Sequence, residues 1–84
     1  MKYKIRLTAF ARKQVRKIDQ RYLSALYKAL DRLANNPRQG EPLGGKFKGA
    51  WKLRFSRYRV IYLIRDWEMV VIVIDVDHRR QVYR

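Results

Sequence analysis

W-K-L-R-F-S-R-Y-R-V-I-Y, residues 51–62, is the stretch that decides the fold. Apolar and cationic side chains alternate along it, and successive side chains of a β-strand point to opposite faces of a sheet. We therefore predict a β-hairpin that turns at Ser56-Arg57 and has one apolar face and one cationic face. The predicted cross-strand partners are Trp51 with Tyr62, Leu53 with Val60, and Arg54 with Arg59.

The cationic face of this hairpin is unusual for a purely structural element. Like charges directly opposite one another destabilise a sheet by a few tenths to about 1 kcal/mol, and Arg54 faces Arg59 in the predicted register. We therefore hypothesise that this face binds a polyanion. The aromatic residues Trp51, Tyr58 and Tyr62 lie on the other face, where we expect them to pack in the core.

The composition sets the class of protein. A chain of 84 residues has room for one domain, residues 1–84, and one core. Hydrophobic residues make up 48% of it, which indicates a globular rather than a disordered protein. Lys and Arg number 21 against 7 Asp and Glu, and the resulting net charge of +14 favours nucleic acid, a ribosome or an acidic protein as the partner.

The chain has no cysteine and only 1 histidine. This excludes a disulfide framework and argues strongly against a structural zinc site. The N-terminal residues carry polar groups throughout, and no stretch approaches the length of an apolar membrane span. We therefore expect a cytoplasmic protein that binds neither a metal ion nor a membrane.

One strand and one helix are predicted at the start of the chain. Residues 2–7 alternate apolar and cationic side chains, as a half-buried strand does. Thr8 can cap a helix over residues 9–18, in which apolar residues recur at helical spacing. The side chains expected to face the core are Tyr3, Ile5 and Leu7 of the strand, and Phe10, Ala11, Val15 and Ile18 of the helix.

A second helix and a loop come next. Asp19 can begin the helix, and Asn35-Asn36-Pro37 ends it because Asn tolerates the left-handed cap conformation and Pro cannot continue a helix. Residues 38–49 are rich in Gly but lack the spacing of a P-loop, so we expect a connection that brings Lys46 and Lys48 near the hairpin. The apolar stripe of the helix is Tyr22, Leu23, Leu26, Tyr27, Leu30, Leu33 and Ala34.

Two strands, residues 58–64 and 70–76, are joined by a short turn at residues 66–68. Together with the first half of the hairpin they form an antiparallel meander, and the two helices cover one of its faces. The predicted fold is therefore an α+β sandwich of two layers. Strand parity places Val70, Ile72, Ile74 and Val76 on the core side, and Val71, Val73, Asp75, Asp77 and Arg79 on the far side with Arg59.

The meander also predicts a site. Neighbouring strands run in opposite directions, so Lys52, Arg54, Arg59 and Arg79 should meet at one edge of the uncovered face, where Tyr83 can reach them. Guanidinium groups bind phosphate bidentately and stabilise the negative charge of a pentacovalent transition state. The cluster therefore suits phosphate chemistry.

Three motifs span most of the chain: N-P-R-x-G-x-x-L-x-G at residues 36–45, W-K-L-R-x-x-x-Y-R-V-I-Y at 51–62, and H-R-R-Q-V-Y at 78–83. Together they resemble the RelE branch of the RelE/ParE toxin superfamily. The resemblance implies a β-α-α-β-β-β order, with a helical hairpin on one face of a small, mainly antiparallel sheet and the strand 2–7 beside the strand 70–76.

This resemblance also implies a function. Such a protein is the toxin of a type II toxin–antitoxin system, and a cognate antitoxin protein neutralises it. It is a ribosome-dependent endoribonuclease that cleaves mRNA in the A site through attack of the ribose 2′-OH on the phosphate. It needs no metal and no cofactor.

Roles for individual residues follow from the resemblance. It implies that Lys52 abstracts a proton, that Arg54 is a second basic residue of the site, and that Arg59 stabilises the phosphate. Arg79 matches an arginine that shares this role or protonates the leaving group, and Tyr83 matches a tyrosine that stacks on the mRNA and orients it.

The remaining basic residues give a second set of candidates. His78 has a counterpart in acid–base chemistry in some relatives, but strand parity turns it toward the core. Asp75 is predicted beside Arg59, so it can neutralise a structural arginine instead of leaving it for phosphate. The cations predicted to contact RNA or the ribosome are Lys46, Lys48, Arg12, Lys13, Arg16 and Arg80.

Two other functions stay open. A ParE-like toxin shares the fold but inhibits DNA gyrase by binding it, without a nuclease site. A basic RNA-binding module that never cuts would be explained by the charge alone. The basic cluster with a terminal tyrosine is what the nuclease needs and the gyrase inhibitor does not.

Overall fold

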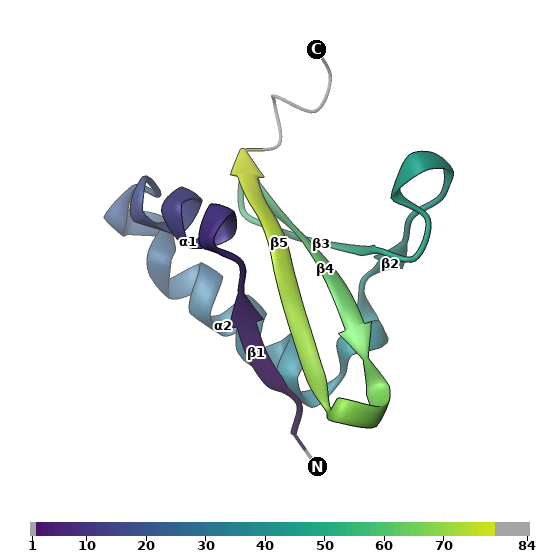
Figure 1. The fold of residues 1–84 in the computed structure, drawn as a ribbon. Helices are drawn as coiled ribbons and strands as arrows, with labels where there is room; N and C mark the ends of the chain where they lie inside the picture. The colour runs from purple at the N-terminus through teal and green to yellow at the C-terminus, as the bar shows by residue number, and fades with distance from the viewer. Residues whose placement is uncertain (1, 79–84) are drawn as a thin grey trace.

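The computed structural model describes residues 2–78, and it has two layers (Figure 1). The helices are α1 (Ala9–Arg16) and α2 (Leu23–Asn35), the strands are β1 (Lys4–Leu7), β2 (Glu41–Pro42), β3 (Trp51–Phe55), β4 (Tyr58–Arg65) and β5 (Val70–His78), and the short 3-10 helices are η1 (Gln20–Tyr22), η2 (Pro37–Gln39), η3 (Gly45–Phe47) and η4 (Asp66–Glu68). None of the helices within residues 2–78 is long and apolar enough to cross a membrane.

The strands form a 5-stranded sheet in the order β1-β5-β4-β3-β2, and both helices cover the same face of it (Figure 1). β1 pairs with β5 in parallel, whereas the other neighbours are antiparallel. The predicted α+β class, the helical hairpin on one face and the place of β1 beside the last strand are confirmed. The other face of the sheet, which we call the uncovered face, carries none of the helices found within residues 2–78.

The predicted hairpin is formed by β3 and β4 in the expected register. Trp51 pairs with Tyr62, and Arg54 pairs with Arg59. Ser56 takes a left-handed conformation in the turn, with φ 52°. Tyr62 is fully buried, and Trp51 and Tyr58 pack against the core as predicted.

The side chains of β5 that face the helices change from odd-numbered to even-numbered residues part-way along the strand. Two consecutive residues of β4 pair with Asp75 and Val73, so Ile74 is an extra residue that forms a β-bulge. An extra residue exchanges the two faces of a strand, because side chains alternate. The prediction for the first half of β5 was therefore wrong: Val71 and Val73 face the helices instead of Val70 and Ile72, whereas Asp75, Val76 and Asp77 lie on the predicted sides.

The helix starts agree with the sequence, although the second start is a separate turn. The Thr8 hydroxyl oxygen accepts a hydrogen bond from the Ala11 amide at 3.1 Å and caps α1. The Asp19 carboxylate accepts one from the Arg21 amide at 2.9 Å, but it caps η1, and α2 begins only at Leu23.

Two aromatic residues assigned to the helical core are exposed. Phe10 and Tyr27 expose 61% and 60% of their surface, while their sequence neighbours Ala11 and Leu26 are fully buried. Consecutive residues of an α-helix point about 100° apart, so a residue beside the centre of the buried stripe lies at its margin. The prediction that Phe10 and Tyr27 face the core was wrong for this reason.

The connection from α2 to β3 is more ordered than a plain loop. Asn36 follows the helix with φ −150°, so it is extended rather than left-handed as predicted, and its side chain accepts a hydrogen bond from the Arg38 amide at 3.3 Å. Glu41 and Pro42 then pair with β3 as the strand β2. A strand of two residues that contains Pro has no alternation from which it could be predicted, so the sequence indicated a loop.

Gly40 and Tyr62 hold this connection against β3. The Tyr62 hydroxyl donates a hydrogen bond to the Pro37 carbonyl oxygen at 2.7 Å, and burial raises the pKa of Tyr62. A Cβ atom at Gly40 would lie 2.5 Å from both the Lys52 carbonyl oxygen and the Tyr62 hydroxyl oxygen. The chain can therefore pass over β3 at this point only because residue 40 has no side chain.

Candidate functional site

Two rows of side chains cross the uncovered face near the C-terminal end of β5. Directly paired residues of neighbouring strands share a face, so the register defines the rows. Three of the predicted catalytic cations, Lys52, Arg54 and Arg59, thereby come together as one cationic cluster. The first row is Arg54, Arg59 and Asp77 on β3, β4 and β5, and the second is Glu41, Lys52, Ile61 and Asp75 on β2, β3, β4 and β5.

Arg59 is the most buried cation of the cluster. Its side chain is 13% exposed, and its Nη2 atom lies 3.1 Å from Oδ2 of Asp75. Its Nε atom is buried and has no hydrogen-bond partner among the described residues. A guanidinium has five N–H donors, so the ion pair with Asp75 leaves donors of Arg59 for an anion.

Asp75 is itself held by α1. The Gln14 side-chain amide donates to Asp75 Oδ1 at 2.6 Å, and the Gln14 amide oxygen accepts from the Val76 amide at 2.6 Å. β1 ends opposite Val73, so Gln14 takes the place of the missing strand at this edge of β5. The predicted contact between Asp75 and Arg59 is confirmed, and Gln14 fixes its geometry.

Lys52 and Arg54 differ in their surroundings. The Lys52 side chain is 23% exposed, and its ammonium lies 3.8 Å from the Glu41 carboxylate. Arg54 is exposed and takes part in none of the ion pairs found among residues 2–78. The cluster is therefore graded, from a paired and buried Arg59 to an exposed Arg54.

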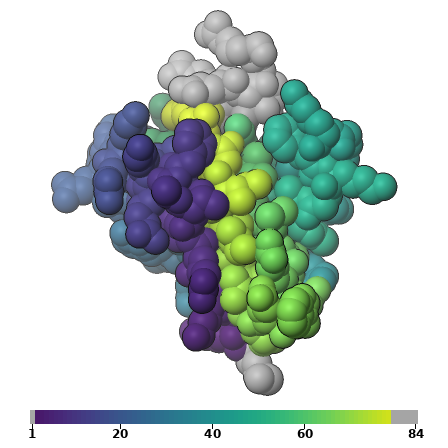
Figure 2. Space-filling view, viewed as in Figure 1, coloured from purple at the N-terminus to yellow at the C-terminus, as the bar shows by residue number. Residues whose placement is uncertain are grey.

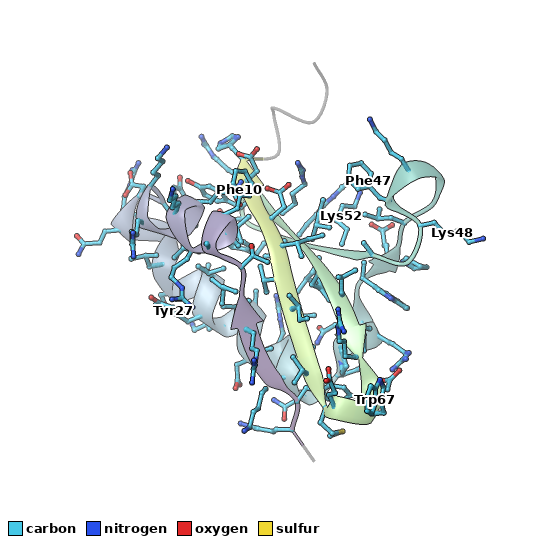
Figure 3. All side chains as sticks on the ribbon, in the orientation of Figure 1. Phe10, Tyr27, Phe47, Lys48, Lys52 and Trp67 are labelled. Atoms are coloured by element: carbon cyan, nitrogen blue, oxygen red, sulfur yellow. The ribbon has the colours of Figure 1, made fainter. Side chains whose placement is uncertain are left out.

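The loop around η3 carries the next set of predicted contacts. Lys46 and Lys48 are exposed, and the loop projects from the body of the molecule beside β3 (Figures 1 and 2). The Lys46 ammonium lies 6.0 Å from the centre of the Phe47 ring, and Phe47 exposes 49% of its surface. Figure 3 shows the Lys48 side chain pointing outward, away from the sheet.

Other predicted residues are not brought to the cluster. Arg12, Lys13 and Arg16 are exposed on α1, which belongs to the helical layer. The His78 ring lies 5.3 Å from the Tyr58 ring in an edge arrangement, on the core side as strand parity predicted. Three predicted residues, Arg79, Arg80 and Tyr83, lie outside the described residues.

Sequence reasoning missed two residues of the site, Gln14 and Glu41. Gln14 is 61 positions from Asp75 in the chain, and Glu41 belongs to the short strand that resembled a loop. Both contacts depend on the order of strands in the sheet. No local pattern marks either residue.

The comparisons with known proteins concern the whole chain. A family described as the ParE toxin of type II toxin–antitoxin systems, parDE, matches residues 5–83. The chain belongs to the RelE/ParE superfamily of toxins. Toxin RelG of Mycobacterium tuberculosis is 36% identical to it over 86 residues, which cover 100% of this chain and 99% of RelG.

Solved structures of RelE/ParE toxins share the fold. The RelBE2 toxin–antitoxin complex of M. tuberculosis contains a chain that matches with a TM-score of 0.87 and 33% identity, over 94% of this chain and 93% of that one. The isolated E. coli RelE toxin matches with a TM-score of 0.78 and 29% identity, over 96% and 90%. The present chain is thus a RelE/ParE toxin of a toxin–antitoxin system, with the fold of these relatives.

Proposed function

We propose that this RelE/ParE toxin is a metal-independent endoribonuclease that cleaves mRNA in the ribosomal A site. The observation that carries the proposal is the cationic cluster, in which Lys52, Arg54 and Arg59 meet on the uncovered face of the sheet. Arg54 lies directly opposite Arg59, and like charges in that position destabilise a sheet. Asp75 already pairs with Arg59, but Arg54 takes part in no ion pair among residues 2–78, so a phosphate in the chain of an RNA can neutralise it.

The chemical step requires only proton transfer and charge stabilisation. The ribose 2′-oxygen bonds to the adjacent phosphorus and loses its proton to Lys52, which must be in its neutral amine form to accept it. The bond from phosphorus to the 5′-oxygen of the next nucleotide breaks, and that oxygen takes up a proton from Arg79 or from water. The products are a 2′,3′-cyclic phosphate and a 5′-hydroxyl, and Arg59 and Arg54 stabilise the added negative charge in the transition state.

The ribosome supplies what the isolated site lacks. In-line attack needs the 2′-oxygen, the phosphorus and the leaving oxygen held in one geometry, and such positioning accounts for several kcal/mol of a barrier, up to about 11. An open sheet face cannot hold a flexible strand in this way. We therefore expect activity on free RNA to be low, with Lys46 and Lys48, the α1 cations and Arg80 contacting RNA or the ribosome, and with Arg79 and Tyr83 completing the site.

A cognate antitoxin is the second partner of the proposal. RelE/ParE relatives have been solved in complexes with antitoxins, and the surplus of positive charge favours an acidic segment of such a protein. We infer that this segment covers the cationic cluster. Toxin, antitoxin and ribosome would meet in the cytoplasm.

The deciding experiment is a cleavage assay with purified toxin and mRNA, with and without programmed ribosomes, read by primer extension. Wild-type toxin is expected to cut only when ribosomes are present. Arg59→Ala should lower the rate by about 100-fold or more, the cost of removing a transition-state donor, whereas Arg57→Ala in the exposed hairpin turn should leave it nearly unchanged. Arg59→Lys keeps a charge beside Asp75 and serves as the second variant if Arg59→Ala does not fold.

The alternative function is inhibition of DNA gyrase, as in ParE-like toxins. One observation favours it, because the family that matches residues 5–83 is described as the ParE toxin of type II toxin–antitoxin systems. A supercoiling assay with purified gyrase separates the two functions. Inhibited supercoiling with intact mRNA would refute the nuclease. RNA binding with no cleavage under any condition would instead leave a non-catalytic RNA-binding module.

A further inference from the structure

A second basic site lies on the uncovered face, at the opposite end of the sheet from the cationic cluster. A pocket of about 340 Å³ opens there between β1 and the turn from β4 to β5. In Figure 2 these two segments stand on either side of β5 in the lower half of the view. Four cations, Lys2, Lys4, Arg6 and Arg65, and one carboxylate, Glu68, line the pocket over an apolar floor.

The register explains why these cations converge. Lys4 on β1 and Arg65 on β4 are both paired with Val70 of β5, one from each side, and paired residues share a face. Their Cα atoms are therefore two strand spacings apart, about 10 Å. Side chains as long as Lys and Arg can reach over Val70 from both sides to one anion. Arg6, paired with Ile72, adds a cation in the next row.

Most of these cations have no ion-pair partner in the part of the chain that the structure describes. Among residues 2–78, Lys4, Arg6 and Arg65 take part in no ion pair, and Lys2 has only an exposed contact with Asp31 at 3.5 Å. Glu68 cannot balance four positive charges. An anion that entered the pocket would therefore find charge and hydrogen-bond donors that are not already committed.

The charge of the pocket favours one anionic partner, RNA, over another, an acidic amphipathic protein segment. Val70 is only 8% exposed, although none of the helices within residues 2–78 covers this face, whereas the other apolar lining residues, Met69 and Ile72, are half-buried. The pocket therefore keeps some apolar surface, but its four cations stand against a single carboxylate. Such an excess of cations suits a phosphodiester chain, which carries a negative charge on every nucleotide.

We propose that this pocket is a second anchor for RNA, which binds a backbone phosphate between Lys4 and Arg65. The inference rests on the proposed function, because it takes RNA as the ligand. Arg59 and Arg65 are six residues apart on β4, so the anchor lies about 20 Å from the cationic cluster. One RNA strand that follows β4 reaches both sites, and the anchor sets which phosphate enters the cluster.

The test measures RNA binding without cleavage. A fluorescein-labelled single-stranded RNA is titrated with wild-type toxin, with Lys4→Ala/Arg65→Ala and with Lys28→Ala/Arg32→Ala, at several salt concentrations. The control pair removes the same two residue types from exposed positions of α2. Thermal unfolding of each variant verifies that it is folded, and Arg65→Gln alone is the milder second variant.

Only the double variant of the pocket, Lys4→Ala/Arg65→Ala, is expected to lose affinity for RNA. Each phosphate contact on a single strand contributes about −0.7 to the slope of log K against log salt. Lys4→Ala/Arg65→Ala should make the slope less steep by about 0.7 and weaken binding about tenfold at low salt, while the α2 pair should change neither beyond a small uniform effect of net charge.

The other outcomes overturn the anchor in distinguishable ways. If the pocket double variant and the α2 double variant bind RNA equally well, and wild-type toxin still cuts mRNA on ribosomes, the anchor is refuted while the proposed nuclease function is retained. If wild-type toxin neither binds nor cuts RNA, both proposals fail.

Discussion

Gly40→Ala is the substitution whose effect the structure specifies most closely. The new methyl group would lie 2.5 Å from the Lys52 carbonyl oxygen and 2.5 Å from the Tyr62 hydroxyl oxygen. Neither atom can retreat freely, because Lys52 lies in the β3 ladder and Tyr62 is fully buried. The connection after η2 must therefore move away from β3.

The cost has two parts. Forcing a methyl group into a filled space costs about 1–3 kcal/mol. Displacing the chain also threatens the hydrogen bond from Tyr62 to Pro37, which contributes about 0.5–1.5 kcal/mol. The sum is about 1.5–4.5 kcal/mol, and a domain of this size loses about 4–8 °C in Tm for each kcal/mol.

Gly44→Ala is the matched control. Nothing lies within 4 Å of a Cβ built at Gly44, and its φ of −116° suits any residue. Urea and thermal unfolding of the two variants should show a large loss for Gly40→Ala and a change within about 0.5 kcal/mol for Gly44→Ala. Equal stability of the two variants would refute the steric reasoning.

A double-mutant cycle locates the clash. Tyr62→Phe removes the hydroxyl oxygen, and with it one of the two close contacts, at the cost of the bond to Pro37. Gly40→Ala/Tyr62→Phe should therefore be less destabilised than the sum of its two single variants, with a coupling of about 0.5–2 kcal/mol. Strict additivity would place the strain at the Lys52 carbonyl instead.

Three further predictions concern other parts of the fold. The Arg38 guanidinium lowers the pKa of Asp66 to about 2, so the stabilisation by Asp66 is present above its unfolded pKa of about 3.9 and is lost as the pH falls toward 2. The difference in Tm between wild type and Asp66→Asn should therefore shrink over that pH range. A Tm difference that does not change with pH would contradict the ion pair. Gln14→Ala removes two hydrogen bonds that hold Asp75 and the edge of β5, and urea unfolding should show a loss of about 1–3 kcal/mol. Ser56→Gly relieves the left-handed residue of the hairpin turn and should raise the stability by about 0.5–1 kcal/mol in the same assay, and an unchanged or lower stability would contradict the strain at Ser56.

The hairpin was predictable because its information is local. Alternation with period two between Trp51 and Tyr62 sets which side chains share a face, and a two-residue turn leaves one register. The pairing of Arg54 with Arg59 followed from these facts and is confirmed. The helix cap at Thr8 is local in the same sense, since its partner is three residues away.

Which side chains in the first half of β5 face the core was not predictable, because a single inserted residue decides it. Five β-branched residues in a row, Val70 to Ile74, carry no alternation that could reveal the bulge at Ile74. The prediction therefore assumed that side chains alternate between the two faces without interruption along the whole strand. It was right beyond the bulge, at Asp75 and Asp77, and wrong before it.

The sequence by itself determined the two-layer fold, the cationic face of the hairpin and the meeting of Lys52, Arg54 and Arg59, because strand period and short turns act over few residues. Tertiary structure alone decided what surrounds them. Gln14 reaches Asp75 because β1 stops short of it, and Glu41 faces Lys52 through a strand of two residues. Lys4 and Arg65 converge on Val70 because a parallel strand and an antiparallel one flank β5. Such contacts depend on the order of strands in the sheet, which no local pattern of side chains encodes.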